Sequence, residues 1–330
     1  MHSMGSCVPR KGKRVAPPDH ARSNGPQQNR MATGMDIRAL FMGFAFALMW
    51  SSAFASARII VAAAPPLASL SLRFLLSGLI GVGIALALGQ SWRLSRLQWR
   101  ATILFGVCQN ALYLGLNFVA MQTVQAGLAA IIASTMPLIV GLAGLFLGEK
   151  LRPLGMIGLL AGFAGAALIM GARIEAGVDL HGVMLCGLGV LALAFATLAV
   201  RGATSGGNFM MIVGLQMLIG AATLGVISLA TESWYVDWSP QLVAAFLYTT
   251  FVPGLAATFV WVWLIDRIGA VRAATFHFLN PFLGVAIAAL LLGEELGPRD
   301  IVGVVIITAG IFAVQYSRGK DAPRKPVRAS

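Results

Sequence analysis

Long apolar stretches separated by short polar segments run along most of the chain. Each stretch is long enough, at roughly 17–25 residues, to cross a bilayer as an α-helix. A membrane strand would instead alternate apolar and polar residues over about ten positions. The pattern therefore predicts an all-α membrane protein with ten transmembrane helices. The predicted spans are residues 38–60, 65–89, 101–121, 126–148, 154–172, 181–201, 208–230, 241–265, 271–293 and 300–317.

Composition supports this fold class, because 58% of the residues are hydrophobic and only 11% are charged. A soluble domain carries about 25% charged residues. Residues 1–37 are too polar to bury a core and are expected to form a disordered basic tail, and 318–330 a second one. Translation from Met1, from Met31 or from Met35 is equally compatible with this reading.

The distribution of positive charge predicts the orientation of the helices. With the amino terminus inside, 20 of the 24 Lys and Arg residues fall on the cytoplasmic side: eight in loops, seven in the first tail and five in the last. The exceptions are Arg58, Arg173 and Arg299 outside and Arg73 within the second span. The positive-inside rule therefore predicts a multi-pass membrane protein with both termini cytoplasmic. The net charge of +12 reflects this topology, and no nucleic-acid partner is expected.

A seven-residue string occurs twice, 145 positions apart. Residues 147–153 read LGEKLRP and residues 292–298 read LGEELGP. The first copy is predicted inside the cell and the second outside, so the chain divides into two inverted five-helix repeats, 38–172 and 173–317. Inverted repeats of this kind are typical of secondary transporters. Further matched pairs are Gly158 with Gly303, Gly165 with Gly310, and Pro137 with Pro281.

These repeated motifs, together with Arg73-Phe74 in the second span, resemble the EamA-type group of the drug/metabolite transporter superfamily. The resemblance covers about residues 38–317. It implies a location in the cell inner (plasma) membrane and two five-helix repeats around a central cavity that opens to one side at a time. It also implies export of amino acids, other metabolites or toxic compounds. It also implies the cavity walls, which would be the spans 38–60, 101–121, 126–148, 181–201, 241–265 and 271–293.

Polar groups at membrane depth are costly, so they mark candidate sites. The predicted spans hold no Asp or Glu near the middle, and His277 is the titratable group at depth whose charge changes near physiological pH. It shares a helical face with Asn280 and Gly284. A cavity role and a hydrogen bond to a neighbouring helix are both open. Glu149 and Glu294 fall at helix ends, where a loop or capping role is expected.

The third span carries an ordered polar stripe. Asn110, Tyr113 and Asn117 recur at i, i+3 and i+7, with Gln109 beside them. A cavity wall is the favoured interpretation, and interhelical hydrogen bonding is the alternative. In the eighth span Thr258 and Trp261 share a face.

Trp50 in the first span and Trp261 in the eighth lie away from the membrane interface, where tryptophan is usually found. Each is a candidate substrate contact through its flat ring and its N–H group. Simple packing is the alternative.

Arg73 is the one cation that lies inside a predicted span and away from its ends. It is a candidate contact for a carboxylate or phosphate, although pairing with loop carbonyls or acids is the favoured interpretation. Pro137 and Pro281 would free backbone carbonyls and permit kinks that gate the cavity. The glycine stripe that begins at Gly155 and includes Gly158 is expected to be a close-packing face, within the chain or between two copies.

These observations predict a secondary transporter, not an enzyme, that exports small metabolites, amino acids first among them. The alternative substrates are amines, nucleobases or toxic drugs; a non-transporting receptor or an intramembrane enzyme is the alternative of a different class. No phosphate-binding loop, catalytic motif or thiolate metal site is present in the sequence, so no cofactor or metal is expected. The expected partners are a small-molecule substrate and the lipid bilayer. The substrate, the direction of flux, the coupling to protons and the choice between monomer and homodimer remain open.

Overall fold

The computed structural model describes residues 37–148, 151–199, 206–269, 273–274 and 276–319. The chain separates into two units, residues 1–37 and 38–330. In the first unit only Ile37, at the start of the first helix, is described. The predicted basic tails therefore lie almost wholly outside the described residues, and so does Glu149.

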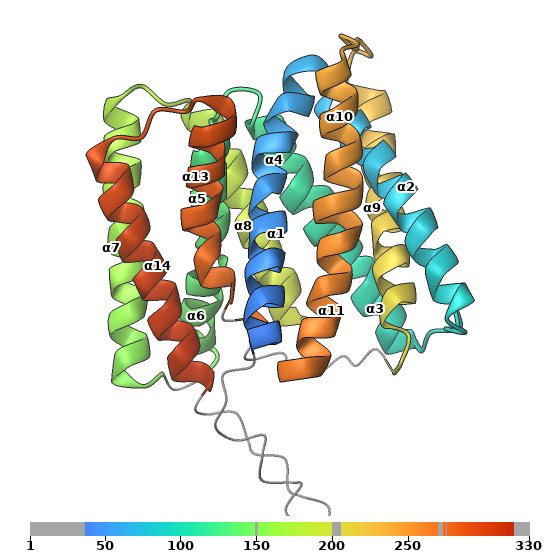
Figure 1. The fold of residues 1–330 in the computed structure, drawn as a ribbon, viewed down its shortest axis with the longest axis horizontal. Coiled ribbons are helices and arrows are strands. Elements are labelled where there is room, and N and C mark those ends of the chain that lie inside the picture. The colour runs from blue at the N-terminus through green and yellow to red at the C-terminus, as the bar shows by residue number, and fades with distance from the viewer. Residues whose placement is uncertain (1–36, 149–150, 200–205, 270–272, 275, 320–330) are drawn as a thin grey trace, which may run out of the picture. The chain divides into compact units, whose positions relative to one another are not determined.

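Helices make up almost all of the described part of the second unit, which confirms the all-α prediction (Figure 1). In chain order the elements are α1 (Ile37–Ala63), α2 (Pro66–Ala87), α3 (Arg96–Phe105), η1 (Gly106–Tyr113), α4 (Leu114–Ala120), α5 (Ala126–Ser134), α6 (Met136–Phe146), α7 (Pro153–Glu175), α8 (Leu180–Ala199), α9 (Phe209–Thr231), α10 (Pro240–Thr249), η2 (Thr250–Ala256), α11 (Ala257–Ile268), η3 (Phe276–Leu279), α13 (Asn280–Leu292) and α14 (Pro298–Gly319). Here η1 and η2 are π-helical and η3 is a 3₁₀-helix.

Within the described residues, nine helices, several built from consecutive elements, are long and apolar enough to cross a membrane. The remaining predicted span, the ninth at residues 271–293, is a shorter apolar helix, Phe276–Leu292. The helix bounds agree with the predicted spans to within five residues. We call the end of the bundle where α1 begins and α14 ends the terminal end, and the opposite end the distal end (bottom and top of Figure 1).

Four spans are interrupted, at matched positions in the two halves. The third and eighth spans each pass through a π-helical segment, and these segments begin 144 positions apart, at Gly106 and Thr250. The fourth span breaks at Thr135 between α5 and α6, and the ninth changes from η3 to α13 at Asn280. The kinks predicted at Pro137 and Pro281 coincide with these two breaks, because each proline lies in the first turn of the second piece.

Helices pack mainly against their counterparts from the other half. The pairs are α2 with α9, α5 with α13, and α7 with α14, the last pair lying side by side at the left of Figure 1. At the α7–α14 contact, a Cβ added to Gly158 would lie 2.8 Å from the carbonyl oxygen of Gly310, and one added to Gly165 would lie 2.9 Å from that of Gly303. The repeated glycines thus pack against each other within one chain.

The repeated Leu-Gly-Glu motif contains a sharp turn at its glycine, and in the second copy the glutamate caps a helix. Gly148 and Gly293 have positive φ angles of +84° and +66°, which glycine adopts without strain. After Gly293 the carboxylate of Glu294 accepts hydrogen bonds from the backbone N–H groups of Ala126 (2.7 Å) and Gly127 (2.9 Å) at the start of α5. The predicted capping role of Glu294 is confirmed. An acidic group at a helix N-terminus satisfies free N–H groups and the helix dipole.

A second pair of caps joins α2 and α9. Glu232, after the end of α9, accepts hydrogen bonds from the backbone N–H groups of Leu67 (2.7 Å) and Ala68 (2.9 Å) at the start of α2. In the opposite direction, the side chain of Gln90 accepts one from the N–H of Met211 in α9 at 3.0 Å. Sequence analysis missed both caps, because no local motif connects residues so far apart in the chain.

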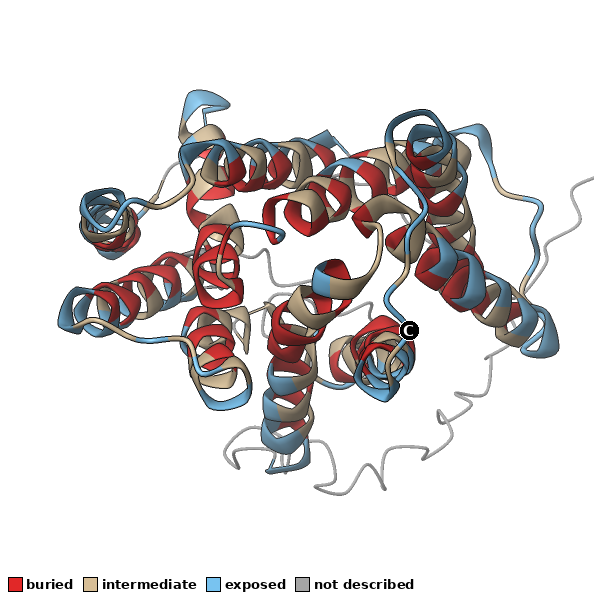
Figure 2. Ribbon diagram, turned by 90° about the horizontal axis from the view of Figure 1, so that it is seen from above, coloured by how far each residue is buried: buried red, intermediate tan, exposed pale blue. Residues whose placement is uncertain are grey.

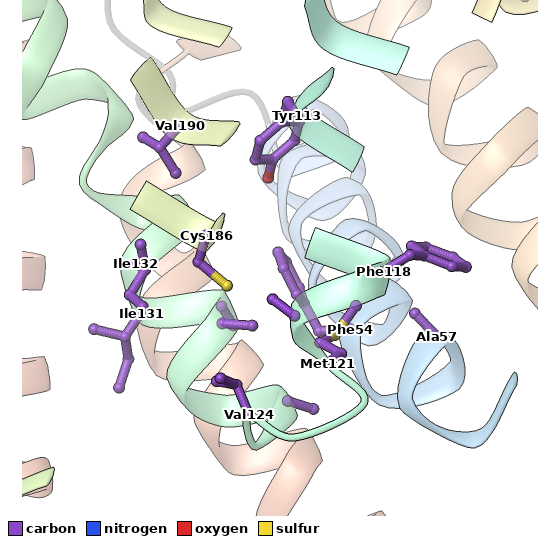
Figure 3. Packing of buried hydrophobic residues seen from close by; sticks show 14 of the residues in the cluster. Phe54, Ala57, Tyr113, Phe118, Met121, Val124, Ile131, Ile132, Cys186 and Val190 are labelled. Atoms are coloured by element: carbon purple, nitrogen blue, oxygen red, sulfur yellow. The ribbon is translucent and has the colours of Figure 1, made fainter. Parts of the chain in front are cut away.

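Buried residues face neighbouring helices, whereas many exposed side chains on the outside of the bundle are large and apolar (Figure 2). Examples are Leu160, Leu290 and Phe41, which are exposed by 65%, 83% and 77%. A water-soluble protein rarely exposes so much apolar surface, so this surface faces lipid. Inside, Tyr113, Phe118, Cys186 and Val190 belong to the main packed core (Figure 3).

Candidate functional site

A cluster of rings joins α1, α11 and η3. The ring of Phe46 stacks on Trp261 with a centroid distance of 4.6 Å, and His277 lies edge-on to both at 5.2 and 5.1 Å. Trp50, one turn after Phe46 on α1, lies 6.3 Å from His277. We call Phe46, Trp50, Trp261 and His277 the aromatic cluster. Three of its members were predicted site residues; Phe46 was missed because it carries no polar atom, although its i, i+4 spacing to Trp50 could have revealed it.

His277 and Asn280 form a polar pair beside these rings. The amide nitrogen of Asn280 lies 3.0 Å from Nδ1 of His277. An amide nitrogen can only donate, so Nδ1 accepts and the uncharged ring carries its proton on Nε2. The amide oxygen of Asn280 is buried and has no hydrogen-bond partner in the described part of the chain. Ser51 on α1 approaches the backbone carbonyl of Asn280 at 3.5 Å.

The predicted polar stripe of the third span lies in helix interfaces. The amide of Asn110 donates to the backbone carbonyl of Gln216 on α9 at 2.9 Å. The amide of Asn117 donates to the carbonyl of Tyr113 at 2.8 Å. A Cβ added to Gly189 of α8 would lie 3.1 Å from the amide nitrogen of Asn117. Tyr113 is buried in the core, and Gln109 is half-buried. These contacts favour interhelical packing for Asn110 and Asn117.

Two other candidates are placed separately from the cluster. Thr258 donates its hydroxyl to the carbonyl of Gly254 in its own helix at 2.8 Å. Arg73 on α2 is only 6% exposed and packs over the ring of Phe74 at 5.3 Å. The favoured sequence interpretation was that loop carbonyls or acids pair with Arg73. The structure gives its guanidinium no such partner among the described residues, and its Nε is buried without a hydrogen bond.

A polar pocket opens at the distal end, between the ends of α1, α5, α10 and α13. Its volume is about 740 Å³. Arg58 in its wall donates to the carbonyl of Met121, and deeper in the bundle the hydroxyls of Ser52 on α1 and Tyr248 on α10 lie 2.8 Å apart. The lining residues include Arg58, Gln125, Asp237, Gln241, Glu294 and Glu295. Ser52 and Trp50 are two positions apart on α1, so this helix connects the pocket with the aromatic cluster.

The remaining charged residues at the distal end form structural pairs. Arg173 contacts both carboxylate oxygens of Asp300, at 3.2 and 2.9 Å, and donates to the side chain of Gln125 at 2.7 Å. Asp179, between α7 and α8, accepts a hydrogen bond at 2.5 Å from the hydroxyl of Thr123, between α4 and α5, and this bond lowers the pKa of the carboxyl below its ordinary value. No group of three His, Cys, Asp or Glu residues in the described ranges is placed to hold a metal ion.

Comparison with known proteins decides the family. Residues 37–171 and 180–316 each match the EamA-like transporter family, so both halves of the bundle are copies of the same domain. The chain belongs to the EamA-like transporter family. EamA membership makes this chain a multi-pass membrane transporter rather than an enzyme, as the motifs predicted.

Several EamA relatives match over most of their length. The chain is 26% identical over 278 residues to the uncharacterized transporter YvbV of Bacillus subtilis, covering 84% of this chain and 90% of that protein. It is 26% identical over 293 residues to the uncharacterized inner membrane transporter YedA of Escherichia coli, covering 87% and 93%. A crystal structure that is 21% identical shares the EamA-like fold with a TM-score of 0.60, covering 85% of this chain and 99% of its own.

One EamA relative has a named substrate class. Over 141 residues the chain is 33% identical to a protein described as the aromatic amino acid exporter YddG of Ancylobacter novellus. The match covers 41% of this chain and 47% of that exporter. The likeness therefore extends over somewhat less than half of each protein.

Proposed function

We propose that this EamA protein is a secondary transporter of the cell inner membrane that exports small metabolites, with aromatic amino acids as its substrates. The observation that carries the proposal is the aromatic cluster, because its flat rings suit stacking against an aromatic side chain. The unpaired amide oxygen of Asn280 beside it can accept a hydrogen bond from a substrate amino group. The partial likeness to an aromatic amino acid exporter supports the same substrate class.

The contacts of α1 support a mechanism of alternating access. The aromatic cluster ties α1 to α11 and η3, while the distal pocket lies between α1 and its neighbours at the other end. We propose that this conformation is closed toward the terminal end and accessible from the distal end. Breaks at Thr135 and at Asn280 supply points where two interior helices can bend. Movement about them would separate the rings and close the distal pocket.

The proposed orientation places the terminal end in the cytoplasm. Among the described residues, Arg93, Arg96, Arg100, Arg152 and Arg267 lie at that end. The positive-inside rule favours such a side as the cytoplasmic one. The distal pocket then faces the outside, which is where an exporter releases its substrate.

Efflux from proteoliposomes tests this function. Vesicles preloaded with radiolabelled phenylalanine or tryptophan are compared with empty-membrane vesicles, with and without a pH gradient, for wild type and His277→Ala. We expect release of both amino acids through the protein. Release of amines or nucleobases alone would move the substrate class to that alternative, and release of nothing from a broad metabolite panel would contradict the transporter function.

The same vesicles decide the role of His277. Flux that ignores the gradient and survives His277→Ala identifies a facilitator in which His277 is structural. Flux that follows the gradient and collapses in the variant identifies His277 as the coupling group, since an imidazole can take up and release a proton.

A further inference from the structure

Arg73 is a buried charge whose guanidinium lies over the ring of Phe74 and has no polar partner among the described residues. Its side chain is 6% exposed, and its guanidinium makes no hydrogen bond or ion pair with any residue that the structure describes. Arginine stays protonated under all ordinary conditions, so this residue cannot escape the cost of burial by losing its charge. Arg73 lies seven residues after the start of α2, about 10 Å along the helix, and well below the distal end of the bundle.

Arg173 of the same chain is an arginine with a structural role, and its guanidinium has polar partners. Arg173 at the distal end is held by both oxygens of Asp300 and by the side chain of Gln125. Removing all partners from a buried charge is strongly destabilising. An arginine at membrane depth that lacks such partners is expected to bind an anion from outside the protein.

Gly254 of η2 lies beside Arg73, and its lack of a side chain lets polar atoms of both helices approach one another. A Cβ added to Gly254 would lie 3.6 Å from Nη2 of Arg73, 3.4 Å from the hydroxyl of Ser77 and 3.1 Å from the carbonyl of Thr249. Ser77 itself approaches the carbonyl of Thr250 at 3.5 Å. The guanidinium therefore lies beside Gly254, close to polar atoms of Ser77 and Thr249, and we call this place between α2 and the π-helical segment η2 the Arg73 niche.

We propose that the Arg73 niche binds the carboxylate of the transported substrate. This inference rests on the proposed function and adds the charged group that the substrate must carry. A guanidinium presents a planar fork of N–H donors that matches the two oxygens of a carboxylate. Gly254 and Trp261 lie seven residues apart in one span, a rise of about 10 Å. A small molecule with a ring at one end and a carboxylate at the other is suited to reach from the aromatic cluster toward Arg73.

The test compares acids with their decarboxylated partners on the purified full-length protein. Thermal-shift titrations give apparent Kd values for phenylalanine and tryptophan, for phenethylamine and tryptamine, and for inorganic phosphate. The variants are Arg73→Met, which keeps the apolar length of the side chain, and Gly254→Ala, which keeps Arg73 and adds one methyl group to the niche. Gly83→Ala on α2 is the matched control, because a Cβ added there meets no atom within 4 Å.

We expect the two amino acids to bind wild type and Gly83→Ala alike, and to bind Arg73→Met at least about tenfold more weakly. Gly254→Ala is expected to weaken the same acids while leaving the affinity of the amines unchanged. Equal weakening of acids and amines, unchanged affinity for acids in both variants, failure of either amino acid to bind wild type, or tighter binding of phosphate than of carboxylates would overturn the inference. Failure of efflux in proteoliposomes would instead contradict the proposed transport function, whatever binds at Arg73.

Discussion

Each half of the protein contains an equivalent helix crossing. The two crossings differ in their side chains and in how their polar groups are paired. In one, η1 crosses α9; in the other, η2 crosses α2. Asn110 and Gly254 are 144 positions apart in the two π-helical segments. On the partner helices, Gln216 and Gly220 follow Arg73 and Ser77 by 143 positions. The residues at the two crossings therefore correspond one to one.

The η1–α9 crossing is closed and its polar groups are paired. Asn110 donates to the carbonyl of Gln216, and a Cβ added to Gly220 would lie only 2.5 Å from the Cβ of Asn110. At the η2–α2 crossing the large polar side chain is Arg73, its neighbour is Gly254, and the charge is unpaired. The comparison teaches that, of two equivalent crossings in a duplicated fold, one can be a structural contact while the other can bind a ligand.

The largest expected difference between the crossings is in their tolerance of an added methyl group. Gly220→Ala forces its Cβ against Asn110, and such overpacking should cost about 1–3 kcal/mol of unfolding free energy. Gly254→Ala meets no atom closer than 3.1 Å and should cost clearly less. Thermal unfolding of the two purified variants measures this difference. Equal losses in both would mean that the crossings are packed alike.

Removing the polar side chain should have opposite effects at the two crossings. Asn110→Leu loses an interhelical hydrogen bond, worth about 0.6–1.7 kcal/mol in a membrane protein. Arg73→Met removes an unpaired buried charge and should raise stability by about 1 kcal/mol while it abolishes carboxylate transport. The melting temperature and the efflux rate of each variant are measured together. A melting temperature that falls in Arg73→Met would show that this arginine has a structural partner after all.

Converting one crossing into the other gives a smaller change in stability. Gly254→Asn places at the η2–α2 crossing the residue that closes the η1–α9 crossing. We expect it to fill the Arg73 niche and to lower amino acid efflux at least about tenfold, with a change in unfolding free energy below about 1 kcal/mol. Efflux that persists at the wild-type rate in this variant would argue against a ligand in the niche.

The smallest effect is expected outside both crossings, at the Thr123–Asp179 hydrogen bond. This bond is the main cause of the lowered pKa of Asp179, so it stabilises the folded protein above the ordinary carboxyl pKa of 3.8 and the benefit is lost as the pH falls through the lowered value. Thr123→Val should therefore melt slightly below wild type at about pH 7, and the gap should narrow as the pH falls below 3.8. A gap that does not change with pH would exclude this linkage.

Sequence patterns predicted the framework because its causes are local. Apolar run length set the spans, arginine and lysine placement set their predicted orientation, and the repeated Leu-Gly-Glu string marked the two turns at Gly148 and Gly293. The π-helical segments were not predicted, because they change hydrogen-bond register without changing the apolar pattern. The caps made by Glu232 and Gln90 were missed for a different reason, since each joins two helices far apart in sequence.

The candidate site was predictable only in part. Trp50, Trp261 and His277 were found because polar or aromatic groups at depth are unusual, and the structure brings all three together. Asn110 and Asn117 gave the same signal, yet their amides bond backbone carbonyls in packed interfaces. A polar residue at membrane depth thus has two explanations, and only the positions of its neighbours distinguish them.

The most direct test of the account compares two tryptophans on one helix. Trp261 belongs to the aromatic cluster, whereas Trp263, two residues later, is 63% exposed on the outer surface. Efflux of radiolabelled tryptophan and phenylalanine from proteoliposomes is measured for wild type, Trp261→Ala and Trp263→Ala at matched protein levels. If the aromatic cluster holds the substrate, Trp261→Ala loses most of the flux and Trp263→Ala keeps it. Equal flux in the two variants would contradict the account.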